Sequence, residues 1–485
     1  MRNKREDTIA AVATAMSASG IGIVRISGPD AMRAADLVYR SMKGKTRLSQ
    51  VPSHTIHYGT IIDTSGQVID EVLVSVMRAP KTYTAEDTVE INCHGGVLAM
   101  RRVLDAVIAC NGRKTAQEDP EEEGIRIRLA EPGEFTRRAF LNGRIDLSRA
   151  EAVMDLIEAK NDYALKNSVS QVRGSLYQKI TTLRSQILYQ IAHIEASLDD
   201  PENLDFSSHI EELEESVHQW KKEVRHLIDT AQDGRLASEG IRTVIVGKPN
   251  AGKSSLLNLM LGEERAIVTD IAGTTRDVLT ETVNVQGITL LITDTAGIRE
   301  TEDQVEKIGV ERAKKSVSEA DLLLWIVDSS APLDENDRQI CTLLEGRPAI
   351  ILLNKSDLDP VVEEADIRKL VSDTLLQKKD LPVLSFSATN RTGFDELVGM
   401  LKDMFFRGKL SWNDEVVITN MRHCSLLQRS EDSLGKVAQS IENGMSEDFF
   451  SIDLMDAYEA LGEIIGEEIG DDLADEIFSR FCMGK

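Results

Sequence analysis

The sequence predicts a chain of mixed class, with an α+β N-terminal domain, a helical bundle made from two separate segments, and an α/β domain inserted between those segments. Three observations lead to this fold. Short β-branched runs recur within residues 21–92, apolar residues spaced three and four apart run through residues 176–198, and a glycine-rich loop follows a strand at residues 243–254. Spacing near two predicts strands, and spacing near 3.6 predicts helices. The length of 485 residues suits about two to four domains.

The composition limits the cellular compartment and the classes of binding partner that we expect. The chain lacks any run of about 18 apolar residues, and its charged N-terminus lacks the apolar segment of a secretory signal, so we expect a cytoplasmic protein without a membrane helix. The five cysteines (93, 110, 341, 424 and 482) lack the paired spacing of a zinc site or a disulfide framework. The net charge of −25 repels nucleic-acid phosphates on average. Contact with RNA therefore requires a local patch or a basic partner, and no binding of DNA is expected.

The N-terminal part is expected to alternate strands and helices. Strands are predicted at residues 21–26, 71–77 and 88–92, and residues 97–110 have helical spacing. The polar and acidic residues 115–124 are expected to form a surface loop. This region is therefore a mixed domain in its own right.

A helical pattern covers residues 146–236 and returns at about 415–480. One apolar stripe on a long helix consists of Leu176, Ile180, Leu183, Ile187, Ile191, Ile194 and Leu198. Asp200-Pro201 ends this helix, and a second helix is expected over about 208–231. Because an inserted domain needs its two ends close together, we favour one bundle built from both segments over two separate helical domains.

Residues Gly247 to Ser254 form a complete phosphate-binding loop of the pattern G-x-x-x-x-G-K-[ST]. The strand at 243–246 precedes it and a helix-forming stretch at 255–259 follows, which is the context that the mechanism requires. Backbone N–H groups and the helix N-terminus would bind phosphate oxygens. Lys253 would reach the β- and γ-phosphates, and Ser254 would bind Mg²⁺.

A second motif, Asn354-Lys355-Ser356-Asp357, follows the apolar run 349–353 about 100 residues later. The carboxylate of Asp357 can accept hydrogen bonds from N1 and the 2-amino group of guanine. Adenine lacks that amino group, so a buried unpaired carboxylate would penalise ATP. Ser387-Ala388, after a predicted strand at 383–386, would brace the base from the other side.

Two further loops are expected at the metal and the γ-phosphate. Asp294-Thr295-Ala296-Gly297 follows a strand at 289–292 and would contact Mg²⁺ through Asp294 and the γ-phosphate through the Gly297 amide. Thr275, within the segment 273–277, would complete the Mg²⁺ shell. The four motifs in this order resemble the translation-factor-related GTPases over about residues 240–407.

The water-orienting glutamine of small signalling GTPases is missing. Ile298, Arg299 and Glu300 follow Gly297, and isoleucine cannot orient water. The catalytic group must therefore come from elsewhere, and the acidic residues within 300–306 are the nearest source. Arg299 could serve as an internal arginine finger or, more simply, as a solvated switch residue.

The C-terminus carries the motif Phe-Cys-x-Gly-Lys at residues 481–485. It is not a prenylation signal, because the last four residues lack the aliphatic pair. The N-terminal half contains Gly-Ile-Val-Arg-Ile-Ser-Gly at 22–28, Cys-His-Gly-Gly at 93–96 and Pro-Gly-Glu-Phe-Thr-Arg-Arg-Ala-Phe-Leu-Asn-Gly at 132–143. Together with the central GTPase-like region, these motifs resemble the MnmE (TrmE) family of tRNA modification GTPases over essentially the whole chain.

The resemblance implies three domains. Residues 1–142 would bind a tetrahydrofolate derivative (5-formyl- or methylene-tetrahydrofolate) and dimerise, residues 143–238 and 408–485 would form the helical domain, and residues 239–407 would form a Ras-like GTPase domain that needs Mg²⁺ and is activated by K⁺. It implies a homodimer that joins the FAD protein MnmG (GidA) in a heterotetramer. Together they would add an aminomethyl-type group (carboxymethylaminomethyl) to C5 of the wobble uridine, position 34, of certain tRNAs.

Residue by residue, the resemblance implies the following sites. The nucleotide residues are Asn250, Ala251, Gly252, Lys253, Ser254, Ser255, Thr269, Thr274, Thr275, Asp294, Thr295, Ala296, Gly297, Asn354, Lys355, Asp357, Ser387 and Ala388. Asn250 and the carbonyls of Thr269, Ile271 and Thr274 would bind K⁺, while Ser254 and Thr275 bind Mg²⁺. Glu306 would position the attacking water. The folate residues are Arg25, Glu90, Arg144 and Lys485, with arginine at 144 where the family often has lysine.

Cys482 is the expected chemical residue of the tail, as a thiol near the one-carbon unit or the uracil ring. The alternative is a small buried residue in a terminal helix. An alternative for the whole chain is an RNA-binding GTPase switch in ribosome assembly that carries out no modification. The folate-domain motifs and the Cys-Met-Gly-Lys tail argue against that alternative, since a switch has no need of them.

Overall fold

The structure is a computed structural model of the chain. It describes residues 7–42, 44, 46–114, 123–199, 209–262, 280–294, 317–376, 381–406, 416–467, 471–479, 481 and 484. The chain divides into two compact units, residues 1–154 with 176–181 and 462–485, and residues 155–175 with 182–461. Among the helices within these described ranges, none is long and apolar enough to cross a membrane.

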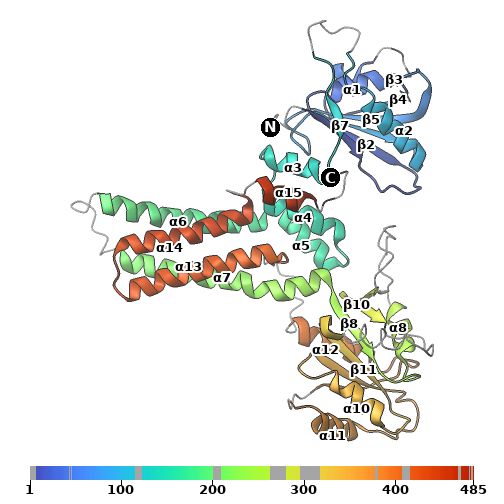
Figure 1. Cartoon of the computed structure of the whole chain (residues 1–485), viewed down its shortest axis with the longest axis vertical. Coiled ribbons are helices and arrows are strands. Elements are labelled where there is room, and N and C mark those ends of the chain that lie inside the picture. Colours follow the sequence, from blue (N-terminus) through green and yellow to red (C-terminus); the bar gives the residue numbers. More distant parts are fainter. Residues whose placement is uncertain are drawn as a thin grey trace. The chain divides into compact units, whose positions relative to one another are not determined.

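The first unit contains a seven-stranded sheet of order β3-β4-β5-β6-β2-β1-β7 (Figure 1). Its strands are β1 (Thr8–Val12), β2 (Gly22–Ser27), β3 (Tyr39–Ser41), β4 (Thr55–Ile62), β5 (Val68–Met77), β6 (Thr88–Cys93) and β7 (Ile127–Leu129). All neighbours are antiparallel except β1 and β7. Helices α1 (Ala31–Val38) and α2 (Val97–Ile108) pack against the sheet, and the alternating pattern of β2 buries Val24 and Ile26 beneath them. The predicted strands and helix of this region are confirmed.

The C-terminal tail packs within this same unit. Helix α3 (Glu134–Leu141) lies against α15 (Asp471–Ser479). Phe478 packs on Phe140 and Phe481, with ring centroids 6.0 and 5.3 Å apart. A Cβ on Gly133, whose φ is +66°, would lie 2.3 Å from the carbonyl oxygen of Phe478, so only glycine permits this approach.

The helical bundle draws on both sides of the inserted domain. Its helices are α6 (Ser175–Asp199), α7 (Ile210–Glu239), α13 (Met421–Glu442) and α14 (Glu447–Ile465), while α4 (Leu147–Glu158) and α5 (Asp162–Val172) precede them. Figure 1 shows α13 beside α7 and α14 beside α6. The Arg184 guanidinium lies 3.9 Å from the Tyr458 ring centroid, and Trp220 donates to Gln186 at 2.9 Å. The prediction of one bundle from two segments is confirmed.

Helix α7 is longer than the sequence predicted, because it continues from residue 231 to Glu239. Gly234 lies within this extension, and a Cβ there would lie 2.4 Å from both the Ile418 carbonyl oxygen and Val417 Cγ1. The absence of a side chain at 234 leaves room for residues 417–418, which follow the inserted domain. Only Gly240 separates α7 from the next strand.

The inserted domain has a six-stranded sheet of order β13-β12-β11-β8-β10-β9. Its strands are β8 (Ile241–Val246), β9 (Thr280–Val285), β10 (Ile288–Asp294), β11 (Leu322–Asp328), β12 (Ala349–Asn354) and β13 (Val383–Ser385), and its helices are α8 (Lys253–Leu261), α10 (Glu335–Thr342), α11 (Glu364–Thr374) and α12 (Phe394–Phe406). All pairs are parallel except β9 with β10. Apolar cores cover both faces, which explains the unbroken apolar run of β11. The predicted fold class is confirmed, and in such a sheet ligands bind at the carboxyl ends of the strands.

Candidate functional sites

The phosphate loop joins β8 to α8, as the sequence predicted. Helix α8 begins at Lys253, so Ser254 lies in its first turn. The Lys253 ammonium donates to the carbonyl oxygens of Gly247 at 2.7 Å and Lys248 at 2.8 Å, which places the positive charge within its own loop. A helix N-terminus and an ammonium at one loop form an anion-binding arrangement that suits nucleotide phosphates.

Asn354 joins the phosphate loop to the two loops expected at the base. Its Nδ2 donates to the Ala251 carbonyl at 2.8 Å, and its Oδ1 accepts from the Ala388 N–H at 3.1 Å. A Cβ on Gly252 would lie 2.0 Å from Asn354 Nδ2, and the φ of Gly252 is +108°. Glycine is therefore required at 252 for packing against Asn354 as well as for access of a phosphate to the backbone.

The carboxylate expected to select guanine is held in place. Ser387 Oγ donates to Asp357 Oδ1 at 2.6 Å, and Ser387 itself is buried. Asp357 and Ser387 thus lie in the same group of loops as Asn354 and Ala388. The structure therefore brings together all the predicted base-contact residues, which come from the ends of β12 and β13.

Other predicted residues lie outside the described part of the chain. These are Thr269, Ile271, Thr274, Thr275, Thr295, Ala296, Gly297, Ile298, Arg299, Glu300, Glu302, Asp303, Glu306, Cys482 and Lys485. The backbone of Asp294 is described: it ends β10, opposite Ile245 of β8. Among the described residues, no cluster of three or more His, Cys, Asp or Glu side chains could hold a metal ion. The roles of these residues stay predictions.

A second site lies in the N-terminal domain around Arg25. Arg25 and Glu90 are cross-strand partners on β2 and β6, and Arg25 Nε donates to Glu90 Oε1 at 2.8 Å. Arg25 Nη1 donates to the carbonyl oxygen of Gly484 at 3.0 Å. A Cβ on Gly484 would lie 2.4 Å from the Cα of Ala13. Only glycine at position 484 therefore allows the backbone to come close enough for its carbonyl oxygen to accept from Arg25. Gly484 therefore contacts Arg25, which is itself paired with Glu90.

Two aromatic residues that the sequence reasoning missed complete this cluster. The Arg25 guanidinium lies 6.0 Å from the Tyr83 ring centroid and 5.6 Å from that of Phe135, and Arg144 lies 5.5 Å from Tyr83. Burial raises the pKa of Tyr83, and the two arginines only partly oppose this, so the phenol is neutral near pH 7. Phe135 sits within the predicted 132–143 motif, whereas no local pattern distinguishes Tyr83.

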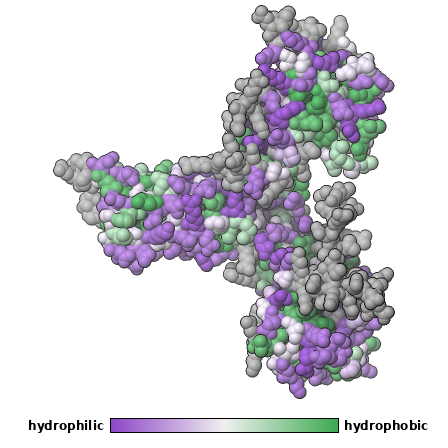
Figure 2. All heavy atoms as spheres, in the orientation of Figure 1, coloured by the Kyte–Doolittle hydropathy of each residue, from purple (hydrophilic) through white to green (hydrophobic). Residues whose placement is uncertain are grey.

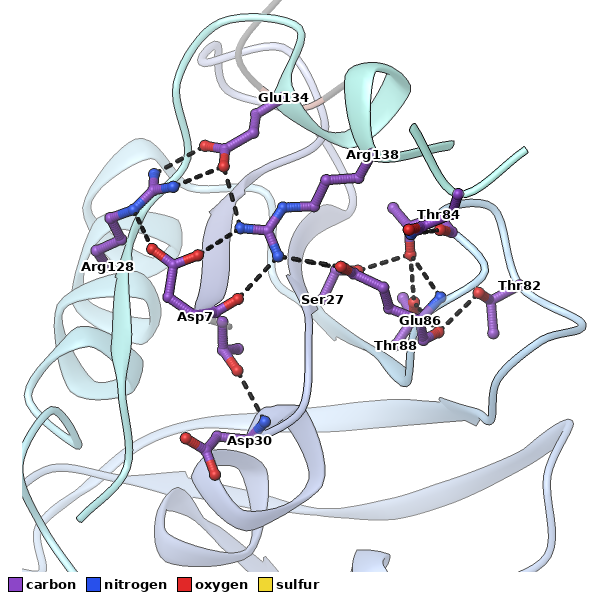
Figure 3. A network of polar contacts seen from close by, with 12 residues as sticks. Asp7, Ser27, Asp30, Thr82, Thr84, Glu86, Thr88, Arg128, Glu134 and Arg138 are labelled. Carbon is purple, nitrogen blue, oxygen red and sulfur yellow. Dashed lines mark hydrogen bonds and ion pairs between the residues drawn. The ribbon is translucent and has the colours of Figure 1, made fainter. Parts of the chain in front are cut away.

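Figure 3 shows the polar network that holds α3 and the segment 82–88 against the sheet. Arg138 donates to Asp7 Oδ1 at 2.7 Å, to Glu134 Oε1 at 3.1 Å and to Glu86 Oε1 at 3.2 Å. Arg128 donates to both oxygens of Glu134, at 2.8 and 2.6 Å, and to Asp7 at 2.6 Å. The hydroxyl groups of Tyr83 and Thr136 of α3 share a hydrogen bond of 2.9 Å. The network that holds α3 in place therefore also fixes the position of Tyr83 beside Arg25.

A parallel sheet with a phosphate loop and an Asn-Lys-x-Asp loop at adjacent strand ends defines a GTPase of the phosphate-loop class, here inserted into a helical bundle. Two family models match the chain: one described as the MnmE helical domain matches residues 147–482, and one described as the GTP-binding protein TrmE N-terminus matches residues 8–144. The chain belongs to the MnmE family.

Curated relatives match along nearly the full length of the chain. The tRNA modification GTPase MnmE of Lachnoclostridium phytofermentans (strain ATCC 700394 / DSM 18823 / ISDg) is 51% identical over 481 residues, covering 99% of this chain and 100% of the relative. The proteins of the same name from Geobacillus kaustophilus (strain HTA426) and Bacillus subtilis (strain 168) are 47% and 45% identical, each over 99% of this chain and 99% or 100% of the relative.

Proposed function

We propose that this chain is the cytoplasmic, GTP-hydrolysing subunit of a tRNA-modifying complex. It would add a carboxymethylaminomethyl-type group to C5 of the wobble uridine of certain tRNAs, together with the FAD protein MnmG. The observation that supports this function most is that one chain carries two separate sites: a nucleotide site around Asn354, and an N-terminal cluster where Arg25 is bonded to both Glu90 and Gly484. The relatives that match over the full length are named tRNA modification GTPases.

The N-terminal cluster has the donor set that a reduced folate requires. Arg25 and Arg144 supply positive charge for a glutamate carboxylate, Glu90 suits the N–H edge of a pterin, and Tyr83 offers a neutral aromatic face. When bound, a tetrahydrofolate derivative would supply the one-carbon unit. Cys482, two positions before Gly484, would be the chain's own nucleophile, and Lys485 a further cation for the folate.

The nucleotide site would hydrolyse GTP with Mg²⁺ at Ser254 and Thr275, and Glu306 would position the water. Asp357 and the loops held by Asn354 would select guanine. Asn250, with the carbonyls of Thr269, Ile271 and Thr274, would hold K⁺ where other GTPases place an arginine finger.

We expect hydrolysis to need Mg²⁺ and to be at least tenfold faster in K⁺ than in Na⁺ at equal ionic strength, since a smaller ion fits a K⁺ cage poorly. Steady-state GTPase rates of the full chain at saturating GTP would measure this. The Asn250→Ala variant is the matched control, because it should hydrolyse GTP slowly and equally in both salts. Equal rates of GTP hydrolysis by the wild-type chain in K⁺ and Na⁺ would contradict the proposed potassium site.

A homodimer formed through the N-terminal domain is part of the proposal. Ile56 and Tyr58 lie on one face of β4, and Leu73 of β5 is paired with Tyr58; all three are about half exposed or more. Figure 2 shows hydrophobic residues gathered on this domain. Such apolar surface supports an association between copies or with a partner.

The test of the function is mass spectrometry of wobble nucleosides in tRNA from cells that lack this chain. We expect the carboxymethylaminomethyl-type modification of uridine 34 to disappear and to return when the chain is restored. An unchanged nucleoside profile would refute the modification chemistry and favour a GTPase switch in ribosome assembly.

A further inference from the structure

Residues 328–337, here called the β11–α10 connection, contact both nucleotide loops although none of them belongs to a motif used above. The connection runs from Asp328, the last residue of β11, into the first turn of α10. Lys355 of the base loop pairs with Asp328 at 2.5 Å between Nζ and Oδ2. Lys248 of the phosphate loop pairs with Asp337 at 2.6 Å and Asp334 at 3.1 Å. Two lysines from different loops are thus held by one short segment.

The carboxylate of Asp328 is oriented by Ser330 as well as by Lys355. Its Oδ1 accepts hydrogen bonds from the N–H and the hydroxyl of Ser330, at 3.0 and 2.6 Å, which leaves Oδ2 directed to the ammonium. Asp328 is also the β-sheet partner of Asn354, the residue before Lys355. Burial by itself would raise the pKa of Asp328, but the bonds from Lys355 and Ser330 outweigh burial and keep the carboxyl ionised.

Lys355 has a backbone conformation that needs support. Its φ is +64°, in the left-handed region that residues other than glycine and asparagine seldom adopt. Its side chain is one-third exposed and its ammonium is bound to Asp328. The aliphatic stem of Lys355 is therefore the part that can lie against the flat face of a base.

Lys248 is held more tightly still. Its side chain is 16% exposed and that of Asp337 is 1% exposed. Burial lowers the pKa of Lys248, but hydrogen bonds to Asp337 and Asp334 more than compensate, so the ammonium stays charged. The Asp334 carboxylate also caps α10, accepting from the N–H groups of Asn336 at 2.9 Å and Asp337 at 3.3 Å. The connection is consequently anchored at both ends.

We propose that the β11–α10 connection sets the relative position of the phosphate and base loops, with Asp328 as a positioning residue that orients Lys355 for guanine. This rests on the proposed function, because it concerns the affinity for GTP. Asp328 itself has its oxygens occupied by Ser330 and Lys355, so it acts through the lysine and does not touch the nucleotide.

The test is the Asp328→Asn variant of the full chain, which keeps the shape of the side chain and removes its charge. We expect a fluorescent GDP derivative to dissociate about tenfold faster, and the KM for GTP to rise by a similar factor. The kcat at saturating GTP should stay within about twofold of wild type. In a Lys355→Met background, the same substitution should change affinity less than twofold, because the two residues act as one unit.

Asp321→Asn is the matched control. Asp321 directly precedes the same strand, has a similarly buried side chain, and pairs with Arg242 through two contacts of 2.9 Å. Asp321 lies at the opposite end of β11, so this variant should have a lower free energy of unfolding but an unchanged affinity for GDP and GTP. Equal loss of affinity in both variants would reduce Asp328 to a structural residue.

Two further outcomes are decisive. Should Asp328→Asn fail to fold, Ser330→Ala removes one donor to Asp328 and should raise the dissociation rate about two- to threefold; an unchanged rate there would overturn the proposal. Wild-type affinity in Asp328→Asn would overturn it as well. A wild-type chain that does not bind GTP would instead refute the proposed function, and this inference with it.

Discussion

Replacing Cys482 with serine is expected to abolish modification of the wobble uridine while GTP hydrolysis continues at the wild-type rate. Serine nearly preserves the volume of cysteine, but its hydroxyl is far less acidic than a thiol and is not a nucleophile near pH 7. The C-terminal residues belong to a different compact unit from the phosphate loop, so the nucleotide site should not respond. A residue needed only for packing would tolerate the exchange.

The measurement compares modified uridine in tRNA from cells that carry only the variant with GTPase rates of the purified protein. Cys424→Ser is the control, because Cys424 is a partly exposed free thiol on α13 in the other unit. Normal modification in the Cys482→Ser cells would make this cysteine a structural residue. The proposed folate site would then have no thiol nucleophile among the residues predicted for it.

Replacing Glu134 with glutamine is expected to destabilise the N-terminal domain by roughly 1.5–3 kcal/mol at pH 7, because Arg128 and Arg138 lose a charged hydrogen-bond acceptor. The Glu134 side chain is 6% exposed and the Arg138 side chain 7%. Asp7 and Glu86 remain in the variant, but they cannot reach the geometry that Arg128 has with both oxygens of Glu134.

The loss should depend on pH. Burial alone would raise the pKa of Glu134, but the bonds from Arg128, the Glu131 N–H and the charge of Arg138 together hold it below the ordinary value of about 4.3. A lowered folded-state pKa means that the carboxylate stabilises the fold fully above about pH 4.3, and that this contribution is lost as the pH falls through the folded pKa. Wild type and variant should therefore converge in acid.

Hydrogen exchange in peptides from β1 and α3 would measure this stability. Tryptophan fluorescence would not report on it, because the tryptophans at 220, 325 and 412 all lie outside the N-terminal domain. Glu131→Gln is the control: this side chain is exposed and three residues away, so its loss should cost less than about 0.5 kcal/mol. Protection equal to wild type in Glu134→Gln would show that the network contributes little.

The sequence predicted those parts of the fold whose information is local. The apolar stripe of α6 needed only the spacing of its own residues, and all but Leu198, near the helix end, are buried. The phosphate and base loops were predictable for the same reason, since each motif is a continuous segment between a strand and a turn. The contact of Gly234 with Ile418 could not be predicted, because these residues lie on opposite sides of the inserted domain in the sequence.

The parts that escaped prediction depend on residues distant in sequence. Arg128 and Asp7 are 121 positions apart, and Arg25 and Gly484 are 459 apart. No periodicity indicates which charges will meet when a sheet closes. Asp328 was missed for a simpler reason: a lone aspartate after an apolar strand has no distinguishing pattern until Lys355 is placed beside it.

The discontinuous bundle has a consequence for synthesis on the ribosome. Helix α7 ends at Glu239, and its neighbour α13 begins at Met421, roughly 180 residues later. At typical elongation rates this is a delay of about 10–40 seconds, during which α6 and α7 have no helices from the second segment to cover their apolar faces. The inserted domain forms from one continuous stretch and can close its sheet during that wait. Completion of the bundle then depends on the return of residues 417–418 to Gly234 after the inserted domain has been synthesised.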